Sequence, residues 1–171
     1  MDIVDCILAD HDRQRRWFAA LDEARDDLES AGKIFNRLRD HLEAHAMAEE
    51  KYFYPTLLEL GKGALDSDSA DETTEDAIDD HNKIANAADA ALNEEVGSDA
   101  WWKCVDKANY QNSAHLSEEE RQGLTDFRRR VPLEKRIALG IKYLAFEADH
   151  VTNVEREEKD PDAYIKENEA A

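Results

Sequence analysis

The chain has 171 residues, with 22 Lys and Arg against 41 Asp and Glu, which gives a formal net charge of −19. That charge argues against binding to nucleic acid or to an anionic membrane surface, and no apolar run is long enough to span a membrane. Glycine, proline and cysteine are scarce, and the N-terminus is acidic where a signal peptide would be basic, so the composition predicts a single cytoplasmic, all-α domain without disulfides.

Breakers and capping residues predict five helices in succession. Turns are expected at Ser30–Gly32, along an acidic linker from Gly61 to Glu75, at Gly97 and before Pro132. Within the second helix, Pro55 is expected to produce a kink. The helices are expected over residues 3–29, 33–60, 73–95, 99–130 and 133–159.

Apolar residues recur at helical spacing, and helices joined by short turns pack as antiparallel neighbours. We therefore expect an up-down-up-down four-helix bundle with an additional C-terminal helix. This would be one domain over residues 1–160, followed by a polar tail over residues 161–171. Its two halves, over about residues 3–60 and 73–130, are expected to be related by an internal duplication.

Four of the six histidines are expected to face the interior, one from each of the first four helices. Each shares a helical face with nearby apolar residues, as His11 does with Ile7 and Phe18. The four are His11, His45, His81 and His115.

Two of these histidines are followed four residues later by glutamate, which gives the pairs His45/Glu49 and His115/Glu119. An i,i+4 pair lies on one helical face, so both side chains of a pair can reach the same point in the interior. Each pair also follows an earlier interior histidine by 34 residues, which makes the pattern H…HxxxE occur twice.

The spacing further predicts that the four histidines lie at one level of the bundle. Residues of an antiparallel pair are level when the turn falls midway between them. The midpoints fall at positions 28, 63 and 98, each within about three residues of an expected turn. Buried His and Glu are costly without partners, which disfavours a purely structural layer of polar side chains.

Four imidazoles and two carboxylates suit a transition metal, and this number of donors favours two ions over one. If both carboxylates bridge, each ion receives two nitrogens and two oxygens, and an oxo or hydroxo bridge leaves one position open for a small molecule. Iron fits this mixed donor set better than manganese, and a structural zinc ion needs only four ligands. We therefore expect two iron ions in an Fe–O–Fe or Fe–OH–Fe centre.

The segments at residues 2–11, 45–50, 80–84 and 115–120 resemble those of the hemerythrin-like, HHE cation-binding proteins, and the resemblance extends over about residues 3–130. It implies a non-haem diiron centre in a four-helix bundle, and a role in carrying or sensing O2, in responding to iron, or in reacting with nitric oxide or peroxide. The ligands that it implies are His11, His45, His81 and His115, with Glu49 and Glu119 as bridging carboxylates.

The sequence departs from the oxygen-carrying hemerythrins at one position. These proteins use a fifth histidine one turn after the third-helix ligand, where this chain has Ala85. His41, one turn before His45, is a candidate fifth ligand or proton relay. Tyr52, seven residues after His45, is a candidate proton donor to a bound peroxide or an iron ligand. For both side chains the alternative is a packing role.

Two further features carry less weight. Glu50 and Glu120 point about 100° away from the neighbouring glutamates, so we expect them in solvent or behind the ligands. The ExxH sequence from Glu147 to His150 resembles a ferritin-like diiron motif, but that class needs two such motifs.

The sequence thus favours a diiron protein that binds or reacts with O2, H2O2 or NO, and its best specific activity is catalase-like removal of peroxide under oxidative stress. The alternative is an iron, oxygen or redox sensor, or an O2-storage protein without turnover. No protein partner is indicated.

Overall fold

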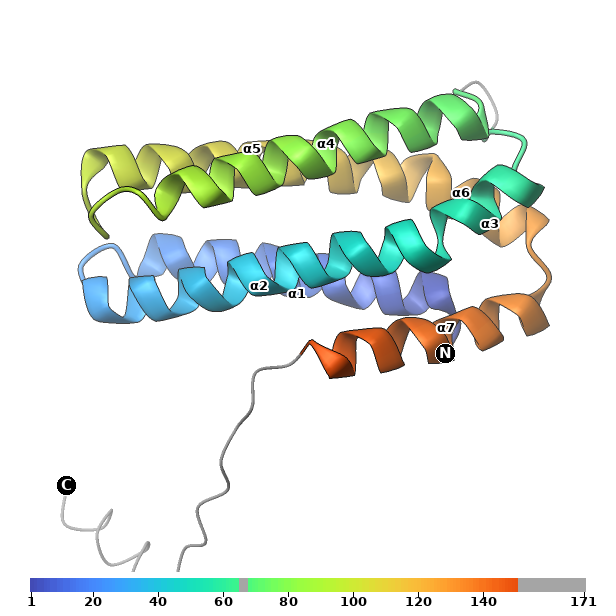
Figure 1. Ribbon diagram of the computed structural model, residues 1–171, viewed down its shortest axis with the longest axis horizontal. Helices are drawn as coiled ribbons and strands as arrows, with labels where there is room; N and C mark the ends of the chain where they lie inside the picture. The colour runs from blue at the N-terminus through green and yellow to red at the C-terminus, as the bar shows by residue number, and fades with distance from the viewer. Residues whose placement is uncertain (65–67, 151–171) are drawn as a thin grey trace, which may run out of the picture.

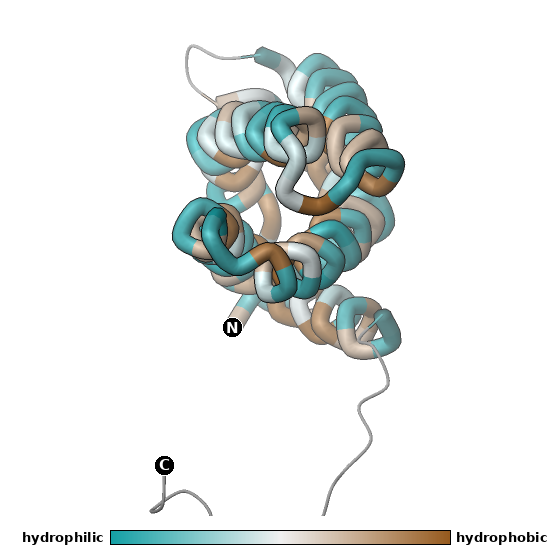
Figure 2. Tube along the Cα trace, turned by 90° about the vertical axis from the view of Figure 1, so that its left-hand side faces the viewer, coloured by the Kyte–Doolittle hydropathy of each residue, from teal (hydrophilic) through white to brown (hydrophobic). Residues whose placement is uncertain are grey.

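Four long helices run alternately in opposite directions and form a bundle (Figure 1). The computed structural model describes residues 1–64 and 68–150, and this part of the chain is all-helical. Two short helices lie at one end of the bundle, and a seventh helix packs outside it against α1 and α2 (Figure 1, Figure 2). The expected fold, a helical bundle with an additional C-terminal helix, is confirmed. In chain order the helices are α1 (Ile3–Glu23), α2 (Leu28–Tyr52), α3 (Tyr54–Leu60), α4 (Ala70–Ala91), α5 (Asp99–Arg121), α6 (Gly123–Arg130) and α7 (Leu133–Asp149).

The first turn lies earlier than expected, because α1 ends at Glu23 and α2 begins at Leu28. The side chain of Asp27 accepts a hydrogen bond from the backbone nitrogen of Ser30 and so caps α2. The expected turn at Ser30–Gly32 is therefore wrong. An aspartate cap starts the helix upstream, and a single glycine inside a helix costs only about 1 kcal/mol.

The second helix is interrupted near Pro55, as expected, and the interruption separates α2 from α3 at Phe53. The fourth expected helix is also interrupted, between α5 and α6 at Gln122, although no proline occurs there. At this break the hydroxyl of Thr125 donates to the backbone carbonyl of Glu120. The expectation of one continuous helix over residues 99–130 is wrong in this respect.

The third and fifth expected helices are also shifted at their ends. Ser69 and Glu72 form a reciprocal capping box, so α4 begins at Ala70, before the expected residue 73. After α4, Gly97 adopts a positive φ of 85°, which glycine tolerates in a tight turn. The expected end of the last helix at residue 159 and the expected tail lie outside the described residues.

Two apolar clusters fill the interior, one toward each end of the bundle. One cluster contains Ile7, Phe53 and Phe127, and the other contains Phe18 and Trp101. His11 lies in α1 between Ile7 and Phe18, so a polar layer separates the two clusters. Within the described residues, no helix combines the length and the apolar character that crossing a bilayer would require.

Candidate metal centre

The polar layer consists of six buried side chains from four helices, and none of them is more than 7 % exposed. α1 and α4 each contribute one histidine, and α2 and α5 each contribute a histidine and a glutamate. This is the set that the sequence predicts to converge, and the structure brings it together. The six are His11, His45, Glu49, His81, His115 and Glu119.

Glu49 lies between the two halves of the cluster. Its Oε1 is 3.2 Å from Nε2 of His45 and 3.9 Å from Nε2 of His11. Its Oε2 is 3.4 Å from Nε2 of His81. Two groups of possible donors, one with His11 and His45 and the other with His81 and His115, therefore share this carboxylate.

Glu119 is placed differently from Glu49. Its Oε2 lies 3.1 Å from Nε2 of His11, whereas its Oε1 accepts a hydrogen bond of 2.6 Å from the hydroxyl of Tyr54. Nε2 of His81 and Nε2 of His115 are 3.2 Å apart. A carboxylate oxygen has two lone pairs, so the Tyr54 hydrogen bond leaves Oε1 able to accept a second partner.

Five buried polar atoms of the cluster point inward without a hydrogen-bond partner among the described residues. They are Nε2 of His11 and of His45, both carboxylate oxygens of Glu49, and Oε2 of Glu119. Buried polar groups in native proteins are nearly always paired, so such a concentration requires an explanation. A cation in the cluster would satisfy all five atoms, and the donor set therefore fits a metal.

The outer nitrogens of two histidines are held by glutamates from the opposite half of the chain. Nδ1 of His11 donates to Oε1 of Glu120 over 2.9 Å, and Nδ1 of His81 donates to Oε1 of Glu50 over 2.9 Å. A hydrogen bond at Nδ1 fixes the ring and leaves Nε2 as the free donor atom. Of the two positions that the sequence allowed for Glu50 and Glu120, they therefore occupy the one behind the histidines.

His45 is held by α7 instead of by a glutamate. Its Nδ1 donates to the hydroxyl of Tyr143 over 2.7 Å, and this hydroxyl donates to Oδ2 of Asp10 over 2.9 Å. Tyr143 is fully buried, and Asp10 is only 2 % exposed. The seventh helix thus contributes directly to the geometry of the cluster.

The pKa values show how strongly the carboxylates attract positive charge. Burial lowers the pKa of His11, but Glu119, Glu120 and Glu49 outweigh it and raise the pKa to about 11. Burial likewise lowers the pKa of His81, but Glu49 and Glu50 raise it to about 10. Without a cation, protons on these two rings therefore balance the carboxylates. A metal ion would displace those protons.

Two residues singled out in the sequence do not join the six. Tyr52 shares a face with His45, as expected, but at its level α7 covers that face, and its ring packs against Phe146 at 6.1 Å between centroids. His41 lies beside Asp10, with 3.8 Å between Nε2 and Oδ1. Sequence reasoning missed Tyr54, whose position follows from the helix break at Phe53.

A pocket of about 30 Å³ reaches the cluster from the side of α2 and α4. His45, His81 and His115 line it together with apolar side chains, and Ala85 also lies on its wall. The charged pair Arg39 and Asp89, 2.9 Å apart, lines it as well. This volume is large enough for a water molecule or another very small ligand.

Comparison with known proteins agrees with this geometry. The family model described as hemerythrin HHE cation binding domain matches residues 2–127. A solved structure, that of a hemerythrin HHE cation-binding domain-containing protein from Mycobacterium kansasii, superimposes with a TM-score of 0.74 at 17% sequence identity, covering 88% of this chain and 87% of that chain. No curated protein sequence matches the chain.

Proposed function

The chain belongs to the hemerythrin HHE cation-binding domain family, and from this premise we propose that it binds two iron ions and removes peroxide. The single observation that carries the proposal is the pair of donor groups that share Glu49. One ion would be held by His11, His45 and Glu49, and the other by Glu49, His81 and His115. Glu119 would complete the set.

Iron suits this set because histidine nitrogens and carboxylate oxygens are mixed and no thiolate takes part. When bound, the two irons would supply the electron transfer that peroxide disproportionation to water and O2 requires. The protein's contribution is to hold the donors at fixed positions. Glu50, Glu120 and Tyr143 fix three of the four imidazole rings through their Nδ1 atoms.

The size and lining of the pocket support a very small substrate. Its volume of about 30 Å³ excludes organic molecules of ordinary size, and its apolar walls limit the water beside the histidines. Ala85 contributes to this space at the position where the oxygen carriers place a fifth histidine. A free position beside His81 and His115 favours reaction with a small ligand over simple carriage.

Tyr54 supports proton transfer better than Tyr52 or His41 does. Its hydroxyl is 2.6 Å from Glu119, and burial, followed by the charges of Glu119 and Glu49, raises its pKa well above the ordinary value. The hydroxyl therefore remains protonated and can donate to an oxygen that develops negative charge beside Glu119. A pocket of about 10 Å³ separates this region from Asp76 and Asp80.

The proposal is tested by loading the full chain with Fe²⁺ without oxygen and then measuring iron per chain, near-ultraviolet charge-transfer bands after exposure to O2, and O2 release from H2O2. We expect two irons, bands that persist under argon, and sustained O2 release. Glu49→Gln should lose both ions, whereas Glu23→Gln, an exposed change of the same kind, should lose neither. Bands that vanish under argon would indicate a carrier, and wild-type protein without iron or bands would overturn the proposal.

One observation favours sensing as a second candidate. Tyr143 connects His45 to α7, and α7 exposes apolar side chains, with Ile141 66 % exposed and Leu144 42 % exposed. A change at the cluster would thus reach a surface suited to contact with another protein. Slow peroxide turnover, together with a large change in protease cleavage of α7 after iron removal, would favour this function.

A further inference from the structure

A second cluster of possible metal donors lies outside the six-residue centre, where α1, α2 and α7 meet. Asp10, His41 and Glu147 each offer one donor atom, and these atoms lie within 4.8 Å of one another. Asp10 and His41 are 2 % and 5 % exposed, and Glu147 is half-buried. None of the three is in the set proposed to hold the iron ions.

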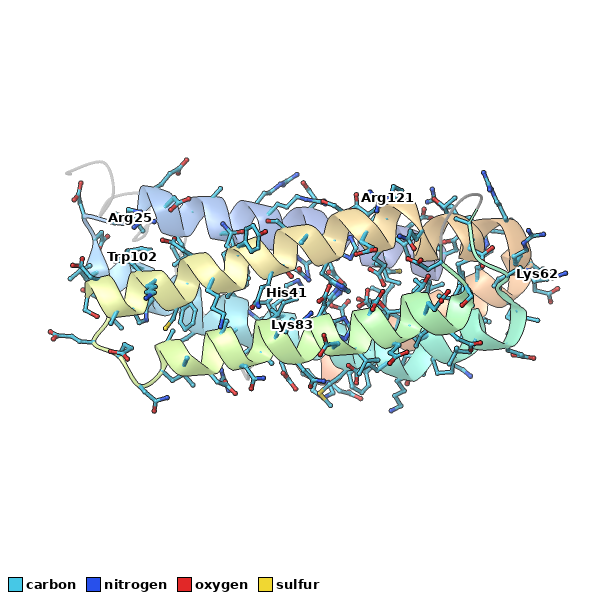
Figure 3. All side chains as sticks on the ribbon, turned by 90° about the horizontal axis from the view of Figure 1, so that it is seen from above. Arg25, His41, Lys62, Lys83, Trp102 and Arg121 are labelled. Atoms are coloured by element: carbon cyan, nitrogen blue, oxygen red, sulfur yellow. The ribbon has the colours of Figure 1, made fainter. Side chains whose placement is uncertain are left out.

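His41 points its inner nitrogen into this cluster without a partner. Nε2 of His41 is buried and has no hydrogen bond among the described residues, although Oδ1 of Asp10 is 3.8 Å away. The ring packs against Trp17, with 5.7 Å between the ring centroids. The labelled side chain lies near the middle of the bundle's length in Figure 3.

Asp10 keeps one oxygen available beside this nitrogen. The hydroxyl of Tyr143 occupies Oδ2, so Asp10 is joined to His45 through that hydroxyl while Oδ1 faces His41. Arg13 donates to Oδ1 over 3.1 Å, but a carboxylate oxygen accepts two partners. The Arg13 side chain is itself half exposed to solvent.

A pocket of about 230 Å³ adjoins the cluster and leaves room for water on an ion. His41 and Glu147 line it, together with Arg13, Arg37 and Asp40. Including Asp10, these charged groups leave one net negative charge at the site. The charge balance is therefore favourable for a cation, although the two arginines reduce the attraction.

We propose that Asp10, His41 and Glu147 bind one divalent transition-metal ion, separate from the dinuclear centre. One imidazole and two carboxylates are a common three-ligand set for zinc, which completes its shell with water. The ion joins α7 to α1 and α2. It thereby explains why a histidine and a half-buried glutamate, which the dinuclear centre does not use, converge on Asp10.

The test is equilibrium dialysis of the full chain against Zn²⁺, with zinc per chain counted in four proteins. Glu147→Gln and His41→Gln each remove a ligand, and the glutamine at position 147 preserves the size of the side chain and its capacity for hydrogen bonding. Glu134→Gln, an exposed change in the same helix, is the matched control. We expect the wild type and the control to bind one zinc more than either ligand variant, with unchanged helix content in each.

The difference between the proteins separates this site from the dinuclear centre. A wild-type total of three that falls to two supports both sites. A total of one that falls to zero supports this site and counts against the dinuclear centre. Equal zinc in all four proteins overturns the proposal. As a second measurement, Arg13→Met removes a competing positive charge and should tighten this zinc several-fold, and weaker binding in that variant would also overturn the proposal.

Discussion

His11 and Glu120 are 109 residues apart in the chain but are joined by a hydrogen bond of 2.9 Å between Nδ1 and Oε1. His81 and Glu50 form the same contact, with the roles of the two halves exchanged. Each residue of the first half corresponds to one exactly 70 positions later, so a duplicated sequence places both contacts at equivalent points. Neither half can orient its own first histidine, and the site therefore requires both.

Glu120→Gln should weaken metal binding about 10- to 100-fold, because the carboxylate that fixes the His11 ring and raises its basicity is lost. Zinc or iron affinity at constant pH checks this outcome. Arg15→Met serves as the control, since it removes only the outer ion pair of Glu120, at 2.7 Å, and keeps the contact with His11. Equal metal affinity in Glu120→Gln and wild type would show that the contact has no role in binding.

The six-residue cluster was predictable from the sequence because it depends on two regular quantities, helical spacing and the position of turns. Its surroundings were not. Tyr54 was missed because the break at Phe53 changes the direction of the chain, and a helical wheel assumes that there is no break. Tyr143 and His41 were misjudged for another reason: the packing of α7 depends on tertiary contacts that periodicity within one helix does not contain.

Tyr143→Phe should destabilise the protein by about 1 to 3 kcal/mol, because buried Asp10 loses a donor and His45 loses an acceptor. Chemical denaturation measures the change in the free energy of unfolding. Tyr110→Phe is the matched control, since that side chain is 78 % exposed. A loss of equal size in both variants would mean that the buried hydroxyl contributes nothing specific.

Tyr54→Phe should reduce peroxide turnover about 100-fold while iron per chain stays at the wild-type value, because the proton donor beside Glu119 is removed. Tyr52→Phe, in which the altered hydroxyl lies on the α7 side, should retain turnover. The two variants are compared by O2 release from H2O2 at matched iron content. Loss in Tyr52→Phe with full activity in Tyr54→Phe would return the relay to Tyr52.

The metal-free protein should lose stability as the pH rises from about 8 to about 10. Neighbouring carboxylates raise the pKa of His11 to about 11 and that of His81 to about 10, from 6.5. The stabilisation from these two protons is complete below pH 6.5 and disappears as the pH rises through the folded-state values. Burial, with the charge of Asp10, raises the pKa of Glu147 to about 8, so its contribution in the same direction is largely spent by then.

Denaturation midpoints at several pH values in this range check the prediction. In the metal-loaded protein the ions replace the protons, so its midpoint should change much less over the same range, and loading should release protons that a pH indicator detects. A flat profile for the metal-free protein would contradict the charge balance that we assign to the cluster.

Ala85→His should suppress peroxide turnover by filling the pocket of about 30 Å³ beside His81 and His115. The new imidazole lies one turn after His81, on the same helical face, and supplies a further nitrogen toward the position that the substrate would use. Ala85→Leu fills the same space without a nitrogen. If the pocket is the route to the metals, both variants lose turnover at unchanged iron content, and only the histidine variant shifts the charge-transfer bands. Full turnover in Ala85→Leu would show that substrate enters elsewhere.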